Sequence, residues 1–198
     1  MTVNVNSPFG FSQWSGTGTT PSYELSQRLI ANGNGHAIFR GDAVIPLSTG
    51  YIDYATNGAG VQLAGIFMGC EYLNTSLNRV VWSNYWPGSG ATGDITAWIV
   101  DDPNSQWLVQ TDSGGPFLLA SVGETVDVST GGVGSTITGL SQMVVTYASL
   151  STSSATLPFR VVGLYQSPPG AVGTDIANPY NYVIVRFAFA TTKVATGV

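Results

Sequence analysis

Three residues in this sequence are of the types that carry out nucleophilic catalysis, and they occur in a workable order along the chain. Ser113 lies in the segment Thr111-Asp112-Ser113-Gly114-Gly115-Pro116, His36 is the single histidine, and Asp53 lies between them. A serine hydroxyl becomes a nucleophile when a histidine accepts its proton and a carboxylate holds the imidazole in the required tautomer. These residues therefore raise the hypothesis of a serine hydrolase site.

The segment around Ser113 resembles the Gly-Asp-Ser-Gly-Gly-Pro nucleophile loop of the chymotrypsin-like serine endopeptidases, which implies a triad of His36, Asp53 and Ser113. Thr111 replaces the first glycine of that loop, and a β-branched residue is poorly suited to the backbone of an oxyanion hole. His36 and Asp53 are also close in sequence for residues that strands must separate. Asp, Ser and Gly all favour turns, so a hairpin loop explains the segment without catalysis. We expect no enzyme, with the endopeptidase as an alternative.

Short strands separated by turn residues make up the chain after residue 35. Runs rich in β-branched and aromatic residues predict strands over residues 37–45, 61–73, 79–86, 95–100, 106–110, 117–122, 125–128, 143–150, 159–165 and 182–190. Gly65 and Gly69 predict bulges or a close backbone approach within the second run, and the glycine-rich stretch 129–141 predicts a loop. About ten short strands are typical of an all-β fold, a β-sandwich of jelly-roll type or a barrel.

Residues 1–35 have a different character, because they are rich in turn residues and poor in periodic apolar residues. We interpret them as an extended N-terminal arm and residues 36–198 as a single β domain. Phe9, Phe11 and Trp14 are isolated aromatics on this arm, and we name them as candidate interaction anchors. The arm could dock on a neighbouring surface through them, or it could fold back on its own domain.

The charge content excludes several classes of function. Charged residues make up 9% of the 198 residues, against about 25% in an ordinary domain, and a surface this poor in charge is typical of a protein packed against neighbours. The six Lys and Arg residues are scattered, so we expect no nucleic-acid partner.

No apolar run is long enough to span a membrane, so we expect no membrane partner. Cys70 is the single cysteine, and we expect it to be a small buried hydrophobe.

Two further kinds of site are conceivable. Four aspartates could supply oxygen ligands to a calcium ion, namely Asp94, Asp101, Asp102 and Asp112. Their spacing matches no calcium loop, and neither a phosphate-binding glycine motif nor a metal-binding pair is present, so we expect no metal and no cofactor. The aromatic group Trp82, Tyr85, Trp86, Trp98 and Trp107 could stack on sugars, which makes a carbohydrate-binding module a second alternative, although core or subunit-contact roles are favoured.

Several segments between residues 39 and 110 share a family resemblance: Phe39-Arg40-Gly41-Asp42-Ala43-Val44, Gly65-Ile66-Phe67-Met68-Gly69-Cys70-Glu71-Tyr72 and Trp82-Ser83-Asn84-Tyr85-Trp86-Pro87. They resemble segments of tailed-bacteriophage virion structural proteins, over about half of the chain. The resemblance implies a non-enzymatic capsid cement (decoration) protein on the capsid surface of the virion, assembled in the host cytoplasm. It also implies binding to the major capsid protein and a homo-oligomer, with a trimer favoured.

Overall fold

The structure is a computed structural model that describes residues 4–16, 20–21, 24–166 and 170–193. Within these residues it contains thirteen β-strands and two short 3-10 helices, so the predicted all-β class is confirmed. Each 3-10 helix has three residues, and no helix in the described ranges is long and apolar enough to cross a membrane.

One sheet, which we call sheet A, is formed largely by the second half of the chain. Its strands in spatial order are β1 (Ser12–Ser15), β10 (Gln106–Gln110), β13 (Tyr182–Phe187), β12 (Phe159–Leu164) and β11 (Thr125–Val126). Neighbouring strands are antiparallel throughout. The sequence boundaries of β10 match the prediction, and those of β12 and β13 lie within it.

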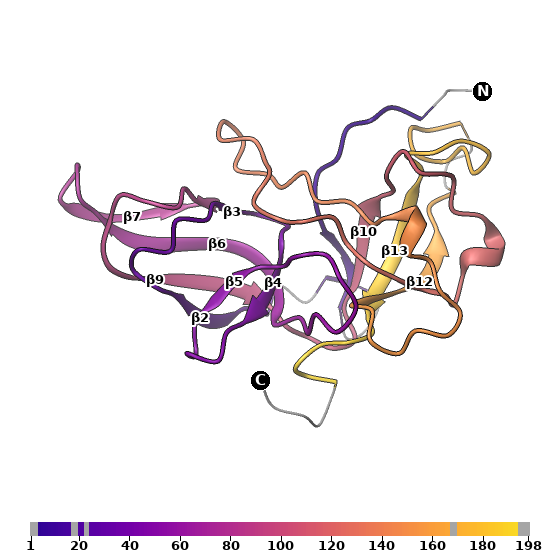
Figure 1. Ribbon diagram of the computed structural model, residues 1–198. Helices are drawn as coiled ribbons and strands as arrows, with labels where there is room; N and C mark the ends of the chain where they lie inside the picture. Colours follow the sequence, from indigo (N-terminus) through magenta and orange to yellow (C-terminus); the bar gives the residue numbers. More distant parts are fainter. Residues whose placement is uncertain (1–3, 17–19, 22–23, 167–169, 194–198) are drawn as a thin grey trace.

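The second sheet, sheet B, lies beside sheet A along the long axis of the molecule (Figure 1). Its order is β2 (Ser26–Ile30), β9 (Ala91–Val100), β6 (Gly65–Asn74), β4 (Ala43–Pro46) and β5 (Ile52–Tyr54). Strand β7 (Arg79–Ser83) pairs with the far half of β6, and β3 (Ile38–Phe39) pairs with β8 (Tyr85–Trp86) in a small ribbon. The turn at Asn84 therefore divides the predicted strand 79–86 in two.

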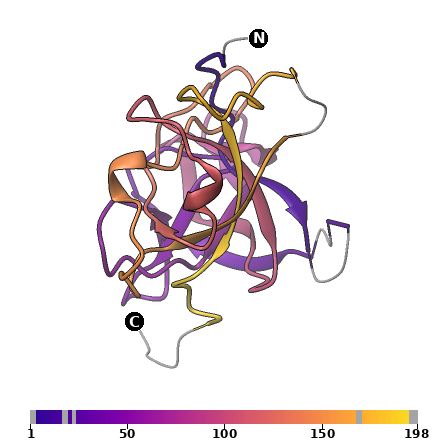
Figure 2. The same ribbon diagram turned by 90° about the vertical axis from the view of Figure 1, so that its right-hand side faces the viewer.

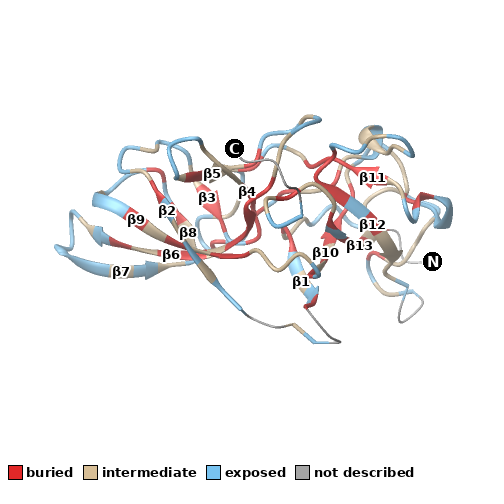
Figure 3. Ribbon diagram, turned by 90° about the horizontal axis from the view of Figure 1, so that it is seen from below, coloured by how far each residue is buried: buried red, intermediate tan, exposed pale blue. Residues whose placement is uncertain are grey.

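Alternation along the strands produces two apolar clusters. Val183, Val185 and Phe187 of β13 point into the first cluster together with Trp107 of β10. The second cluster lies under sheet B and includes Cys70, which is fully buried as expected, so that burial raises the pKa of its thiol to about 12. The first cluster also contains residues from the inner ends of β4, β6 and β9, namely Ala43, Ile66 and Val100. The two sheets therefore share a core where they meet, as the buried colouring in Figure 3 shows.

The described residues of the N-terminal segment fold back on their own domain, which is one of the two possibilities left open for the arm. Strand β1 forms the edge of sheet A against β10, and β2 forms the edge of sheet B against β9. Phe11 stacks on Phe159 with ring centroids 4.5 Å apart. A short polar segment becomes a strand when the edge of a neighbouring strand is open to pair with it, and local periodicity does not show such an edge.

Two predicted strands are replaced by turns on the end of the molecule that faces the viewer in Figure 2. Residues 117–122 contain η1 (Leu119–Ser121), and residues 143–150 contain η2 (Tyr147–Ser149). The carboxylate of Asp112 accepts a hydrogen bond from the backbone N–H of Tyr147 at 3.1 Å. This bond offers the backbone an alternative to strand pairing at the start of η2.

The glycine-rich loop 129–141 is fastened to sheet B by one buried carboxylate. Asp42 accepts hydrogen bonds from the backbone N–H of Phe39 at 2.8 Å, from that of Gly132 at 3.2 Å and from the hydroxyl of Ser141 at 2.6 Å. Its side chain is fully buried. Burial dominates over these hydrogen bonds and raises the pKa of the carboxyl to about 6.

Candidate functional site

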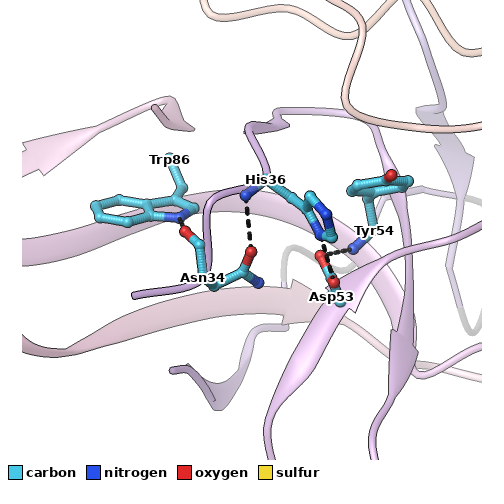
Figure 4. Close-up of polar contacts among 5 residues, drawn as sticks. All are labelled: Asn34, His36, Asp53, Tyr54 and Trp86. Carbon is cyan, nitrogen blue, oxygen red and sulfur yellow. Dashed lines mark hydrogen bonds and ion pairs between the residues drawn. The ribbon is translucent and has the colours of Figure 1, made fainter. Parts of the chain in front are cut away.

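His36 and Asp53 are in direct contact (Figure 4). His36 lies between β2 and β3, and its Nδ1 is 2.8 Å from Oδ2 of Asp53 on β5. The other carboxylate oxygen accepts the backbone N–H of Tyr54 at 2.8 Å, and the Tyr54 ring lies edge-on to the imidazole at 4.9 Å. The side chain of His36 is 55% exposed. The short sequence separation of the two residues is therefore no obstacle to their meeting, and that objection is wrong.

The backbone before His36 is held in place by Asn34. Its side-chain oxygen accepts the backbone N–H of His36 at 2.8 Å, and its carbonyl oxygen accepts the indole N–H of the buried Trp86 at 3.2 Å (Figure 4). These bonds connect the pair of His36 and Asp53 to the core of sheet B.

Ser113 is not part of this arrangement. It lines a separate surface hollow together with Thr130, Val133 and Gln142, and neither His36 nor Asp53 lines that hollow. No hydrogen bond between Ser113 and His36 occurs in the described part of the chain. Asp112 stabilises the turn by accepting the backbone N–H of Gly114 at 3.0 Å, as expected of a turn-forming segment. The structure thus brings together two of the three proposed triad residues and leaves the serine apart.

Thr111 has a structural role at the start of this turn. It is fully buried, and its hydroxyl lies 3.1 Å from the side-chain oxygen of Asn181, which also accepts the backbone N–H of Phe117 at 3.2 Å. Asn181 in turn donates its side-chain N–H to the carbonyl oxygen of Phe117 at 2.9 Å. The segment around Ser113 is therefore fixed from its buried side to Asn181, the residue before β13.

The four aspartates weighed as calcium ligands each serve local structure. Asp94 accepts the backbone N–H of Asn32 and the hydroxyl of Tyr51, which together hold the pKa of its carboxyl below the usual value. Asp101 pairs with Arg28 at 3.0 Å, and Asp102 accepts the backbone N–H of Asn104 at 2.9 Å. Among the residues that the structure describes, no three His, Cys, Asp or Glu side chains gather as a metal site would require.

The aromatic residues divide between core and surface. Trp86 and Trp107 are buried, whereas the side chain of Trp82 on β7 is 55% exposed. The indole of Trp82 lies over Gly69, where an added Cβ would be 2.7 Å from Cζ2 of the ring. The pairing of β6 with β9 shifts register between Phe67 and Gly69, so the bulge predicted at Gly69 is confirmed.

Trp82 belongs to an uncovered apolar face of sheet B. In an antiparallel sheet, directly paired residues point to the same side. Glu71 pairs with Trp82 and Thr96, Leu73 pairs with Val80, and Thr96 pairs with Leu29. We define the outer face of sheet B by the residues on this side, which are Gln27, Leu29, Glu71, Leu73, Val80, Trp82, Thr92, Thr96 and Trp98. Leu29, Leu73, Val80 and Trp82 are exposed, and Glu71 is the one charged member of the set.

The three predicted interaction anchors have different environments. Phe11 is buried in the first cluster, so it could dock on another protein only by leaving its own core. Phe9 is half-buried and lies edge-on to Tyr182 at 5.3 Å. Trp14 is 44% exposed and lies edge-on to Tyr165 at 5.8 Å. Of the three, Trp14 is the most available to a partner.

The exposed residues of β7 were missed as a surface feature, although the sequence carries a signal for them. Val80, Val81 and Trp82 are three consecutive apolar residues, so a strand must present apolar side chains on both of its faces there.

Comparisons with protein-family models, curated proteins and solved structures find no match to this chain.

Proposed function

We propose that this protein is a non-enzymatic structural protein of a tailed-bacteriophage particle, a cement protein that binds the major capsid protein on the capsid surface. The observation that supports this proposal most is the outer face of sheet B, where large apolar side chains lie uncovered beside one charged residue. Contiguous exposed apolar patches mark surfaces that bind other proteins. The low overall charge of the chain agrees with such a role.

The distribution of side-chain types on this face also suits a protein interface. Interface centres are enriched in aromatic and apolar residues, depleted in charge, and dominated by a few anchors, among which tryptophan is frequent. Trp82 is an uncharged aromatic residue with an exposed side chain, as expected of such an anchor, and it lies on strand β7 rather than on a loop.

The segments that resemble phage virion proteins fall in sheet B and its ribbon. Residues 65–72 lie in β6, residues 39–44 run from β3 into β4, and residues 82–87 run from β7 through β8. The resemblance and the uncovered face thus concern the same half of the molecule, which supports sheet B as the part that contacts the shell. The resemblance also favours a homo-oligomer, with a trimer as the expected form.

Binding to empty heads tests this proposal directly. Heads produced without this protein are mixed with the purified chain, and the bound fraction is measured by co-sedimentation. Introducing charge on the outer face with Leu29→Glu and Leu73→Glu should weaken binding by at least about tenfold, because each loses apolar burial and places a carboxylate in the interface. Leu119→Glu is the matched control, since Leu119 is 72% exposed on η1, away from sheet B.

Two results would contradict the proposal. In one, the wild-type protein does not bind heads. In the other, the control variant loses as much binding as the outer-face variants, which would mean that added charge disturbs binding wherever it is placed.

A further inference from the structure

Strand β7 leaves one of its edges unpaired. Within the described ranges it pairs with β6 alone, over Arg79 to Ser83, and Figure 3 shows it along the exposed margin of sheet B. Every second residue of an edge strand directs its backbone N–H and C=O away from its neighbour. Such a row of unpaired groups is a template for a strand of another chain.

The strands at the other ends of the two sheets carry features that discourage pairing, whereas β7 carries one only at its first residue, where Arg79 starts from the same side of the sheet as the inward-facing Val81. Strands β5 and β11 have three and two residues, and the pairing of β1 shifts register between Gln13 and Ser15. On β2, Arg28 pairs with the buried Ala97, so its charged side chain starts from the inner side of the sheet. Short length, bulges and inward charges are the known means of protecting sheet edges.

By contrast, β7 is regular and apolar at its centre. Its register with β6 runs without a shift, it contains no proline, and its one charge is at the first residue, Arg79. The side chains of Val80 and Trp82 are 65% and 55% exposed.

The sequence of β7 is complementary to itself. If two copies pair antiparallel about a two-fold axis at Val81, then Val80 lies opposite Trp82 of the second copy, and Arg79 lies opposite Ser83 of the second copy. Pairs of an aromatic and a β-branched residue stabilise antiparallel sheets, whereas like charges directly opposite destabilise them. This register makes two such favourable pairs and places no charge opposite a like charge.

We infer that two copies of this chain pair edge to edge through β7, antiparallel and centred on Val81, so that sheet B continues across the contact. The inference deepens the proposed function and rests on it, because this pairing would link neighbouring copies of a cement protein on the shell. This two-fold contact is distinct from the three-fold contact of a trimer. Five residues per strand form an interface below about 1,200 Å², the class of weak contacts, and binding of both copies to one shell would raise its effective strength.

Sedimentation velocity over a concentration series tests the pairing. The wild-type chain should self-associate as its concentration rises toward about 1 mM. Two double variants, Val80→Glu with Trp82→Glu and Val80→Lys with Trp82→Lys, place like charges opposite each other, and each should self-associate at least about tenfold more weakly. Mixed together, the acidic and basic variants should form a heterodimer, because each Glu then faces a Lys of the other chain.

The control is a double variant of equal charge elsewhere, Leu118→Glu with Leu119→Glu, on two exposed residues before and within η1. It should self-associate as the wild type does. The inference is overturned if the wild type shows no β7-dependent association at about 1 mM, or if the mixture associates no better than either variant alone. Because the head-binding test uses Leu29 and Leu73, a protein that binds heads and does not pair through β7 would refute this inference and leave the proposed function standing.

Discussion

The buried carboxyl of Asp42 should make the stability of the protein depend on pH in an unusual direction. Its side chain is fully buried, and its polar partners are two backbone N–H groups and one hydroxyl, with no cation among them. Burial raises the pKa of Asp42 from 3.8 to about 6. A shift of about two pKa units corresponds to about 3 kcal/mol of free energy between the two protonation states.

The sign follows from the raised pKa. The folded protein holds this proton more tightly than the unfolded chain, so the stabilisation is fully present below the unfolded pKa and is lost as pH rises through the folded pKa. Asp42 should thus lower the free energy of unfolding by about 3 kcal/mol between about pH 4 and pH 7. Asp42→Asn keeps an oxygen that can accept the N–H groups of Phe39 and Gly132 and removes the titration.

Urea denaturation of both proteins at several pH values over this range measures the effect, with the free energy of unfolding taken by linear extrapolation. The stability of the wild type relative to Asp42→Asn should fall as pH rises, whatever the other carboxylates contribute, because these are common to both proteins. Parallel pH profiles for the two proteins, or a wild type that gains relative stability toward neutral pH, would refute the reasoning.

Three further predictions concern the core, the bulge and the serine. Phe11→Ala should lower the free energy of unfolding by about 3–5 kcal/mol because it opens a cavity against Phe159, whereas Trp14→Ala, at an exposed ring, should lower it by less than about 1 kcal/mol. Urea denaturation measures both losses as shifts of the midpoint with unchanged slopes. Equal losses for the two variants would contradict the assignment of Phe11 to the core. Gly69→Ala should displace the indole of Trp82, which lies where the new methyl would be, and shift its fluorescence emission; an unchanged spectrum would mean that the ring does not rest on Gly69. A serine-directed fluorophosphonate should leave Ser113 unlabelled by mass spectrometry, because His36 does not reach it, and labelling that depends on His36 would reinstate the endopeptidase alternative.

The strands with regular apolar patterns could be predicted from the sequence, because their signal is local. β13 alternates over Val183, Val185 and Phe187, and β10 is an apolar run bounded by turn residues, so both were located closely. The glycine at position 69 also carried its own signal, since a residue without Cβ is what a close ring contact requires.

Features that depend on distant partners could not be predicted in this way. Ser12 pairs with Leu108 and Ser26 pairs with Ile99, and nothing in the local sequence of residues 12–30 indicates those partners. The contact between His36 and Asp53 similarly depends on how β5 folds back to pair with β4, which brings Asp53 to a residue that lies before β3. The uncovered outer face is known only once the pairing of β6, β7 and β9 sets which side chains share a side.

The pairing of β1 with β10 also has a consequence for the order in which the chain folds during synthesis. The hairpin of β6 and β7 joins residues close in sequence, so it can form as soon as it emerges, whereas β1 must wait until β10 has been made. Contacts between distant residues form slowly because a long loop must close first. The segment around β1 therefore stays open to chaperones and proteases until β10 has been made, and Phe11 stays unpacked until the chain has been synthesised past its stacking partner Phe159.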